Sequence, residues 1–268
     1  TTIGSLGARI KDMHRHATYL RWVYRDGNGI IRDADVGFSF MSLTEKEDRF
    51  NAGNLSRNRK TDLRDDTYAL NARFVSDSSI GELTYGFDYY FDEVNSSRDN
   101  FTNGVFSGSR VQGVVGDDSE YHQFGAYIQD KIGLSENLDL VLGTRFSWIR
   151  MNANQVRGVP SGEISGDWNE LSSTAHLVYR FNEDVNGYIG VSQGFRAPNL
   201  SDSTRDGEFA SNGTEVPTSN LDAEYFTTYE AGLNVTKESY NIQAALFYTK
   251  INGLIERLSA GKDNIDGH

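Results

Sequence analysis

Hydrophobic and polar residues alternate one by one along most of this 268-residue chain. The clearest stretch is residues 137–149, in which Leu138, Leu140 and Leu142 alternate with polar residues such as Asp139. Successive side chains of a β-strand point to opposite faces, so this period of two predicts strands with one apolar and one polar face.

Ten stretches of the chain carry this alternation, and each is roughly nine to thirteen residues long. Crossing a bilayer at a tilt takes ~9–11 residues, whereas strands of soluble sheets average about five or six. The length therefore favours strands that span a membrane. The predicted strands are residues 16–25, 34–43, 67–74, 82–91, 123–134, 137–149, 171–181, 187–196, 225–235 and 240–249.

The connections between these strands alternate between short and long. This asymmetry is typical of an all-β, transmembrane, antiparallel up-and-down β-barrel with tight periplasmic turns and extended extracellular loops. A soluble all-β protein with one wet face would show the same alternation and stays as the alternative. The short turns are residues 26–29, 76–79, 135–136, 182–184 and 237–239, and the long polar stretches are residues 44–66, 92–120, 150–167 and 197–224.

Composition narrows the class of protein. Hydrophobic residues make up 37%, and the net charge of −12 offers no basic surface for nucleic acid. Cysteine is absent, so neither disulfides nor thiolate metal sites form. No stretch of ~18 apolar residues predicts a spanning helix. Thr1–Ile10 lack the apolar segment of a signal peptide, so an exported protein would have its start elsewhere.

Three ordered motifs lie between about Tyr121 and Ile255. The first covers residues 188–200 and contains a Gly-Phe-Arg-Ala-Pro box at residues 194–198, followed by a second around residues 220–233. The third, residues 124–145, begins Phe-Gly-Ala-Tyr-Ile-Gln-Asp. Together these motifs resemble those of TonB-dependent outer-membrane receptors. The motif positions are Gly194, Phe195, Arg196, Ala197, Pro198, Asn220, Leu221, Glu224, Glu230 and Gly232.

This resemblance implies a bacterial outer-membrane transporter that takes up a scarce nutrient and is not an enzyme. It also implies a barrel of about 22 strands around a separate plug domain, which the TonB complex contacts. Residues 1–268 would then be part of the barrel domain, without plug or closing strand and ending at His268 inside an outer loop. The implied partners are the TonB complex, outer-membrane lipid and a small nutrient, with no cofactor and no resident metal.

The motif residues also have a purely structural interpretation, which we favour over substrate contact. Pro198 lacks an N–H and ends the strand ladder, Gly194 allows close backbone approach, and Arg196 faces the polar side beside acidic loops. The ligand-binding residues stay unidentified at this stage.

Other candidate chemistry is weaker. Residues 190–194 match the G-x-S-x-G nucleophile elbow, but that motif needs a strand-turn-helix corner, and none is expected here. His14 and His16 share one strand face without a third metal ligand, while His122 and His176 are expected to face a hydrated lumen. The acidic long stretches could bind calcium, but solvated loops are the simpler interpretation.

The substrate is the least determined feature. In haem-uptake members of the resembled family a histidine lies between the two boxes, and residues 199–221 contain none. Haem is therefore a less favoured substrate. The resemblance implies a ferric siderophore as the default substrate of the family, followed by cobalamin or a carbohydrate, and the residues do not choose among these. A passive porin or adhesin barrel, or a soluble β-sheet binding protein, is the alternative function.

Overall fold

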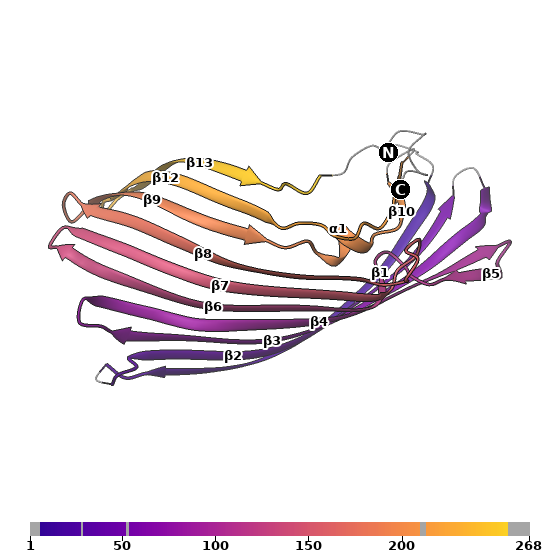
Figure 1. The fold of residues 1–268 in the computed structure, drawn as a ribbon, viewed down its shortest axis with the longest axis horizontal. Coiled ribbons are helices and arrows are strands. Elements are labelled where there is room, and N and C mark those ends of the chain that lie inside the picture. Colours follow the sequence, from indigo (N-terminus) through magenta and orange to yellow (C-terminus); the bar gives the residue numbers. More distant parts are fainter. Residues whose placement is uncertain (1–5, 28, 52–53, 210–212, 257–268) are drawn as a thin grey trace.

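Ten long strands lie side by side in one curved antiparallel sheet (Figure 1). The structure, a computed structural model, describes residues 6–27, 29–51, 54–209 and 213–256. The predicted all-β, up-and-down architecture and its ten strands are confirmed. The chain end at His268 and the first residues, Thr1–Ser5, lie outside the described residues, so the predictions made for the two termini stay predictions.

The strand order follows the sequence, with β5 pairing only β4 and β10 pairing only β11. A five-residue helix, α1, precedes the β10–β11 hairpin. The elements are β1 (Leu6–Arg25), β2 (Asp33–Asn51), β3 (Asn54–Asp77), β4 (Gly81–Thr102), β5 (Val105–Arg110), β6 (Asp117–Ser135), β7 (Leu138–Gln155), β8 (Ile164–Arg180), β9 (Val185–Arg196), α1 (Leu200–Thr204), β10 (Gly207–Phe209), β11 (Gly213–Glu215), β12 (Glu224–Thr236) and β13 (Asn241–Asn252).

Most of the strands are longer than the alternation predicted, and the long polar stretch at residues 44–66 is a wrong prediction. It forms the paired ends of β2 and β3, with a register that continues to Phe50 opposite Asn58. Charged side chains hold these ends together, as Lys46 does with Asp62 at 3.4 Å. Oppositely charged cross-strand pairs stabilise a polar hairpin that has no apolar face to bury.

The two ends of the sheet differ, as predicted. The short-turn end joins β1–β2, β3–β4, β6–β7, β8–β9 and β12–β13 through short connections. Its turns close by backbone hydrogen bonds such as Ser78 N–H to Gly81 O, 2.8 Å, and Lys237 N–H to Tyr240 O, 2.9 Å. The opposite loop end carries β5, α1 and the β10–β11 hairpin, all on the right in Figure 1.

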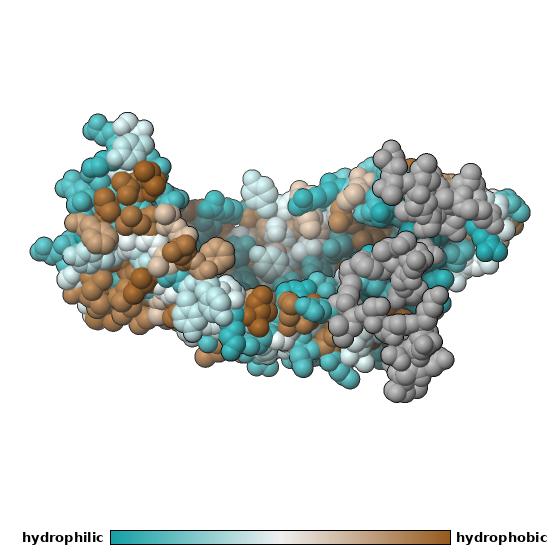
Figure 2. All heavy atoms as spheres, turned by 90° about the horizontal axis from the view of Figure 1, so that it is seen from above, coloured by the Kyte–Doolittle hydropathy of each residue, from teal (hydrophilic) through white to brown (hydrophobic). Residues whose placement is uncertain are grey.

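The two faces of the sheet carry different chemistry. We call the face that bears Asp88, Arg145 and His176 the inner face, and the face that bears Leu142 and Leu171 the outer face. Inner side chains are mostly buried or half-buried, whereas Leu142 is 42% and Leu171 59% exposed. In the view of Figure 2, hydrophobic side chains gather over the short-turn half of the molecule. Among the described strands, β1 and β13 have one neighbour each, so the sheet is open at both edges.

A row of rings crosses five strands of the outer face. Phe40, Tyr68, Phe91, His122 and Trp148 follow one another, with ring centroids 5.0, 6.0, 4.7 and 6.4 Å apart. The expectation that His122 faces a hydrated lumen is therefore wrong. Its strand parity is that of the outer apolar residues, and its Nδ1 lies 2.8 Å from the Tyr89 hydroxyl.

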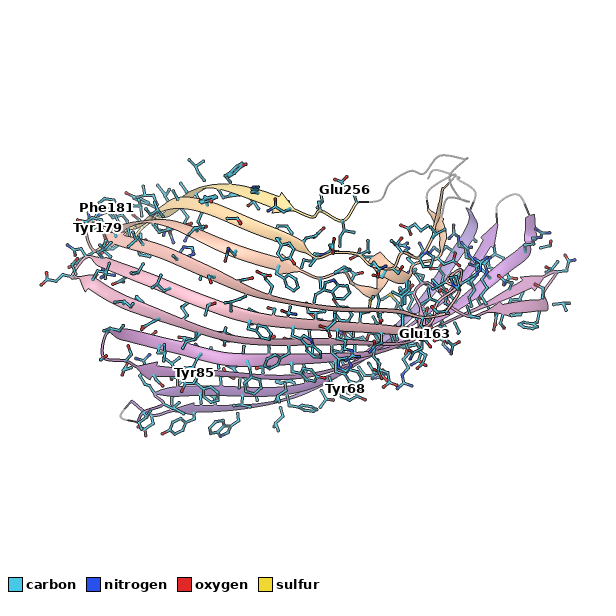
Figure 3. All side chains as sticks on the ribbon, in the orientation of Figure 1. Tyr68, Tyr85, Glu163, Tyr179, Phe181 and Glu256 are labelled. Carbon is cyan, nitrogen blue, oxygen red and sulfur yellow. The ribbon has the colours of Figure 1, made fainter. Side chains whose placement is uncertain are left out.

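More rings gather toward the short-turn end, where Figure 3 labels Tyr85, Tyr179 and Phe181. Phe74 stacks on Tyr85 at 5.5 Å, and Tyr179 contacts Phe181 at 5.0 Å. Two aromatic girdles that flank an apolar band mark the membrane-spanning part of a barrel. We take the strand segments from the short-turn end up to the ring row as the membrane-spanning segments.

Candidate functional site: the inner wall and the loop end

An ion pair lies on the inner wall where β4, β6 and β7 meet. The Arg145 guanidinium donates to both carboxylate oxygens of Asp88, at 2.8 and 2.7 Å. It crosses β6 over Gly125, where a Cβ would lie 1.8 Å from Arg145 Nη2. Because Gly125 has no side chain, it leaves space for the Arg145 side chain. The ion pair thus connects β7 with β4 across the intervening strand β6.

A second inner pair spans β8, β9 and β12. His176 Nδ1 lies 3.4 Å from the Glu230 carboxylate, and Gly190 stands between them in the pairing register. A Cβ on Gly190 would lie 2.2 Å from His176 Nδ1. Gly232 likewise leaves space for the ring of Tyr188, because a Cβ on Gly232 would lie 2.4 Å from the nearest ring atom. The two motif residues Glu230 and Gly232 therefore contact neighbouring strands.

The motif arginine ties the end of β9 to the loop that follows it. Arg196 donates to Asp202 at 2.6 Å and lies 3.0 Å from Glu224, the first residue of β12. Glu224 is buried and accepts a further hydrogen bond from the Ile255 N–H, 2.8 Å. This hydrogen bond, followed by Arg196, lowers the pKa of Glu224 below its ordinary value.

Helix α1 begins at a complete capping box. The Asn199 side chain accepts the Asp202 N–H at 2.9 Å, and the Asp202 carboxylate accepts the Asn199 N–H at 3.1 Å. Reciprocal bonds of this kind satisfy N–H groups that a helix start leaves without partners. Pro198 lies directly before the cap, and Phe195 contacts Tyr225 with ring centroids 5.9 Å apart.

Three loop segments meet around two fully buried polar side chains, Gln112 and Thr204. Gln112 donates to the Thr204 carbonyl at 2.8 Å and accepts the Arg157 N–H at 2.6 Å. The Thr204 hydroxyl accepts the Gly116 N–H, also at 2.8 Å. Buried polar groups persist only when hydrogen-bonded, so this network fixes the loops relative to one another.

An apolar cluster lies beside that network and is the main hydrophobic core of the described residues. Its members are Tyr121, Met151, Ala153, Val156 and Ile164. The Tyr121 hydroxyl donates to the Pro198 carbonyl at 3.0 Å, and burial raises the pKa of Tyr121 to about 12. Trp168 packs on the cluster and donates to the Leu221 carbonyl at 3.1 Å. Asn220, the motif residue directly before Leu221, has a left-handed backbone with a φ of +62°.

Two carboxylates of the acidic stretch at residues 197–224, Asp206 and Glu215, are ion-paired, which corrects the solvated-loop interpretation for these two residues. Asp206 lies 2.7 Å from Arg157 and 3.4 Å from Arg110, and Arg205 lies 2.9 Å from Glu215. Within the described residues, no three His, Asp or Glu side chains gather in a way that could hold a metal ion.

One carboxylate outside the membrane-spanning segments has an unusual environment. Asp65 lies on the inner face of β3, three residues past Tyr68 toward the loop end. Burial, and secondarily the neighbouring charge of Asp92, raises the pKa of Asp65 to about 6.

The remaining sequence candidates are separated in space. Ser192, the centre of the G-x-S-x-G match, lies within β9 opposite Thr174 and Thr228. A short helix does follow this strand, contrary to expectation, but the chain first continues to Arg196 as strand. His14 and His16 lie on β1 beyond the ring row, and His14 Nε2 lies 3.3 Å from Asp12.

Comparison with protein families identifies this arrangement. Residues 4–267 match the family described as TonB dependent receptor-like, β-barrel. The chain belongs to this family. Receptors of the family are β-barrels of the outer membrane of Gram-negative bacteria, which places this receptor chain in that membrane. No curated protein matches the sequence.

Solved structures of high similarity are receptors of the same architecture. The copper transporter OprC superposes with a TM-score of 0.72 at 12% identity, over 88% of this chain and 38% of that chain. The hemophore receptor HasR of Serratia marcescens, with hemophore HasA and heme, gives 0.71 at 17% identity, over 91% and 40%. The ferric citrate transporter FecA gives 0.72 at 14%, over 94% and 37%.

The receptor chain thus spans about two fifths of the length of these structures, and at such identities they show the shared fold. No helix of the described receptor residues is long and apolar enough to cross a membrane.

Sequence reasoning missed the residues that hold the loop end together. Gln112, Thr204 and Asp206 carry no motif, because a buried polar network depends on contacts between segments distant in sequence. The start of α1 did have a signal, since Asn199-Leu200-Ser201-Asp202 has the spacing of a capping box.

Proposed function

We propose that this chain forms part of the wall of a transporter that takes up a scarce nutrient across the outer membrane, energised by the TonB complex. The observation that carries the proposal is a family barrel wall with a charged inner face and an apolar outer face. The complete barrel would contain about 22 strands around a plug that contacts TonB. Inner charges such as Arg145 and Asp88 are already paired with each other, so they offer a polar wall rather than one strong binding charge.

We propose a ferric siderophore as the substrate. The solved relatives named above include carriers for copper, heme with its hemophore, and ferric citrate, so the fold alone does not choose among cargoes. Within the described residues, no histidine lies on the inner face at the loop end. His122 belongs to the outer ring row, and His176 is paired with Glu230 in the middle of the wall. A haem iron needs an axial ligand from its carrier, whereas a siderophore brings a full ligand set.

We further propose that the motif residues shape the wall instead of contacting substrate. Arg196 and Glu224 pair across the junction of β9 and β12, and Glu230 and Gly232 contact side chains of β8 and β9. The side chains free to bind a ligand would then be those on loop segments between these anchors.

The test is uptake of radioactive iron by cells that carry the full-length receptor and lack their other iron receptors. We expect accumulation from ferric siderophores that stops when the TonB gene is deleted. A set of ferric siderophores, cobalamin, haem and oligosaccharides gives the specificity. Uptake that persists without TonB would establish a passive porin, and TonB-dependent uptake of cobalamin or a sugar alone would overturn the siderophore assignment.

A further inference from the structure

Strands β8 and β9 separate part-way along their length. Their register pairs Thr174–Arg180 with Asn186–Ser192, and beyond that point β9 pairs only with β12. Figure 1 shows β8 and β9 diverging from there toward the loop end. The first unpaired backbone donor of β8, the Ser173 N–H, is satisfied by the side-chain oxygen of Gln193 at 3.1 Å.

A hollow of about 720 Å³ lies at this fork on the outer face. Small or polar residues such as Thr144, Ser173 and Ala175 line it together with larger side chains such as Ile128 and Tyr229, and we call the part lined by the small or polar residues the floor. These side chains share the parity of the exposed apolar residues Leu142 and Leu171, so the hollow opens toward lipid. Its volume is that of a small-molecule site, although it is open along one side.

The hollow extends from the short-turn end toward the middle of the membrane. It follows one cross-strand row that begins at Leu83 and Asp130 and ends at Val191 and Tyr229. Leu83 lies two residues after the start of β4, whereas Tyr229 lies seven residues before the end of β12. At ~3.4 Å per residue, the far end is deeper in the membrane than the near end.

The floor of the hollow is polar but needs no water. The Thr144 hydroxyl lies 3.3 Å from the Ser173 hydroxyl and donates to the Ser172 carbonyl, while Gln193 occupies the Ser173 N–H. Polar groups that are satisfied within the protein can lie against hydrocarbon at little cost. The hollow therefore accepts an apolar chain.

The end of the hollow nearest the short turns carries a charged side chain. Asp130 is the one carboxylate that lines it, and Asp130 Oδ1 is buried and accepts no hydrogen bond from the described residues. An acidic group on the lipid-facing side of a barrel is costly unless a cation compensates it. The short turns of outer-membrane barrels face the periplasm, so headgroups of the periplasmic leaflet lie at this level.

We propose that this hollow holds one phospholipid of the periplasmic leaflet with a primary ammonium headgroup. Its acyl chain lies along the floor toward Tyr229, and its ammonium group pairs with Asp130. Charge complementarity selects the ammonium, because Asp130 repels an anionic headgroup. The assignment does not depend on which nutrient the receptor carries.

The experiment is native mass spectrometry of the full-length receptor, delipidated in detergent and titrated with phosphatidylethanolamine or with phosphatidylglycerol. We expect the wild-type receptor to bind phosphatidylethanolamine about tenfold more tightly, the effect of one ion pair partly shielded from water. Asp130→Asn keeps the shape of the side chain and should bring this ratio to within about twofold. Ser173→Leu fills the floor and should weaken both lipids about fivefold or more.

Ala231→Leu is the matched control, since it adds a similar bulk to the outer face of β12 outside the hollow and should leave both affinities unchanged. Heat-modifiable mobility verifies that each variant is folded. Equal binding of the two lipids by the wild-type receptor would overturn the proposal without any variant. Retention of the preference in Asp130→Asn would overturn it as well, as would a receptor dimer whose interface covers the hollow in place of lipid.

Discussion

Arg196 and Glu224 face each other across the junction of β9 and β12, with Arg196 Nη1 3.0 Å from Glu224 Oε2. Arg196 is the last residue of β9 and Glu224 is the first residue of β12, the neighbouring strand in the sheet, so the pair closes the base of the loop at residues 197–223. The Glu224 side chain is 6% exposed, whereas that of Arg196 is 40% exposed. The stabilisation of the Glu224 carboxylate therefore depends on its partners within the protein more than that of the Arg196 guanidinium does.

Glu224→Gln is expected to lower the free energy of unfolding by ~1–3 kcal/mol at pH 7, less than for a fully buried pair because Arg196 reaches solvent. The pKa of Glu224 is lowered in the folded state, so its contribution is present above the ordinary pKa near 4.3 and is lost as pH falls through the folded value. Urea unfolding in lipid vesicles at pH 7 measures the first effect, and a series continued to pH values well below 4 measures the second.

Asp184→Asn is the control for that substitution, because Asp184 pairs with Lys237 at an exposed turn. We expect less than ~1 kcal/mol from it. Equal losses in the two variants would contradict the role assigned to Glu224.

Asp65 predicts the opposite pH dependence. Its pKa is raised to about 6, so the folded protein binds an extra proton between about pH 4 and pH 6. The stability that this residue contributes is therefore greatest below about pH 4 and falls as the pH rises through 6. Asp65→Asn should remove this fall and stabilise the protein at pH 7 by ~1–3 kcal/mol. Unfolding curves for the two proteins that stay parallel from pH 4 to pH 7 would show the shift to be absent.

The stability of the barrel is predicted to require glycine at position 190. A methyl group there would meet the His176 ring, so Gly190→Ala should separate His176 from Glu230 and destabilise the barrel by ~1–3 kcal/mol. Gly133 is the control, because nothing lies within 4 Å of its Cβ position, and Gly133→Ala should change stability by less than ~0.5 kcal/mol. Urea unfolding compares the two, and similar values would reject the packing role of Gly190.

The two faces of β7 can be assigned directly because the chain has no cysteine. Single cysteines at Leu140, Val141 and Leu142 of the full-length receptor accept a spin label without background. We expect labels at 140 and 142 to be accessible to oxygen dissolved in the lipid, and the label at 141 to favour an aqueous relaxing agent. The neighbouring positions act as controls for one another, and equal accessibility at all three would contradict the placement of the faces.

The alternation of residues was sufficient to predict the ten strands, because a one-residue slip would turn every apolar side chain of a strand to the wrong face. It could not predict where the strands end. Beyond the ring row, pairs such as Lys46 and Asp62 replace the apolar face, and charged strand residues look like loop in a single sequence. His122 has the strand parity of Phe124 and lies on the outer face with it, so the position in the alternation outweighs the preference of an imidazole for polar surroundings.

The motif gave the positions of Arg196 and Glu224 but not their contacts. Their geometry depends on Asp202 and Ile255, and the latter lies far along the chain. The network of Gln112 and Thr204 has no local pattern at all, because each partner comes from a different loop.

Nearly every strand of the sheet pairs with its neighbour in sequence, and this order bears on how the barrel assembles. A hairpin closed by a short turn costs little chain entropy, and that cost rises with the logarithm of loop length. Among the adjacent pairs, β9 and β12 are joined through the longest connection, residues 197–223. Their docking therefore carries the largest closure cost in the sheet, and assembly should pause at this step, with β1–β9 paired first and the β12–β13 hairpin added as a unit.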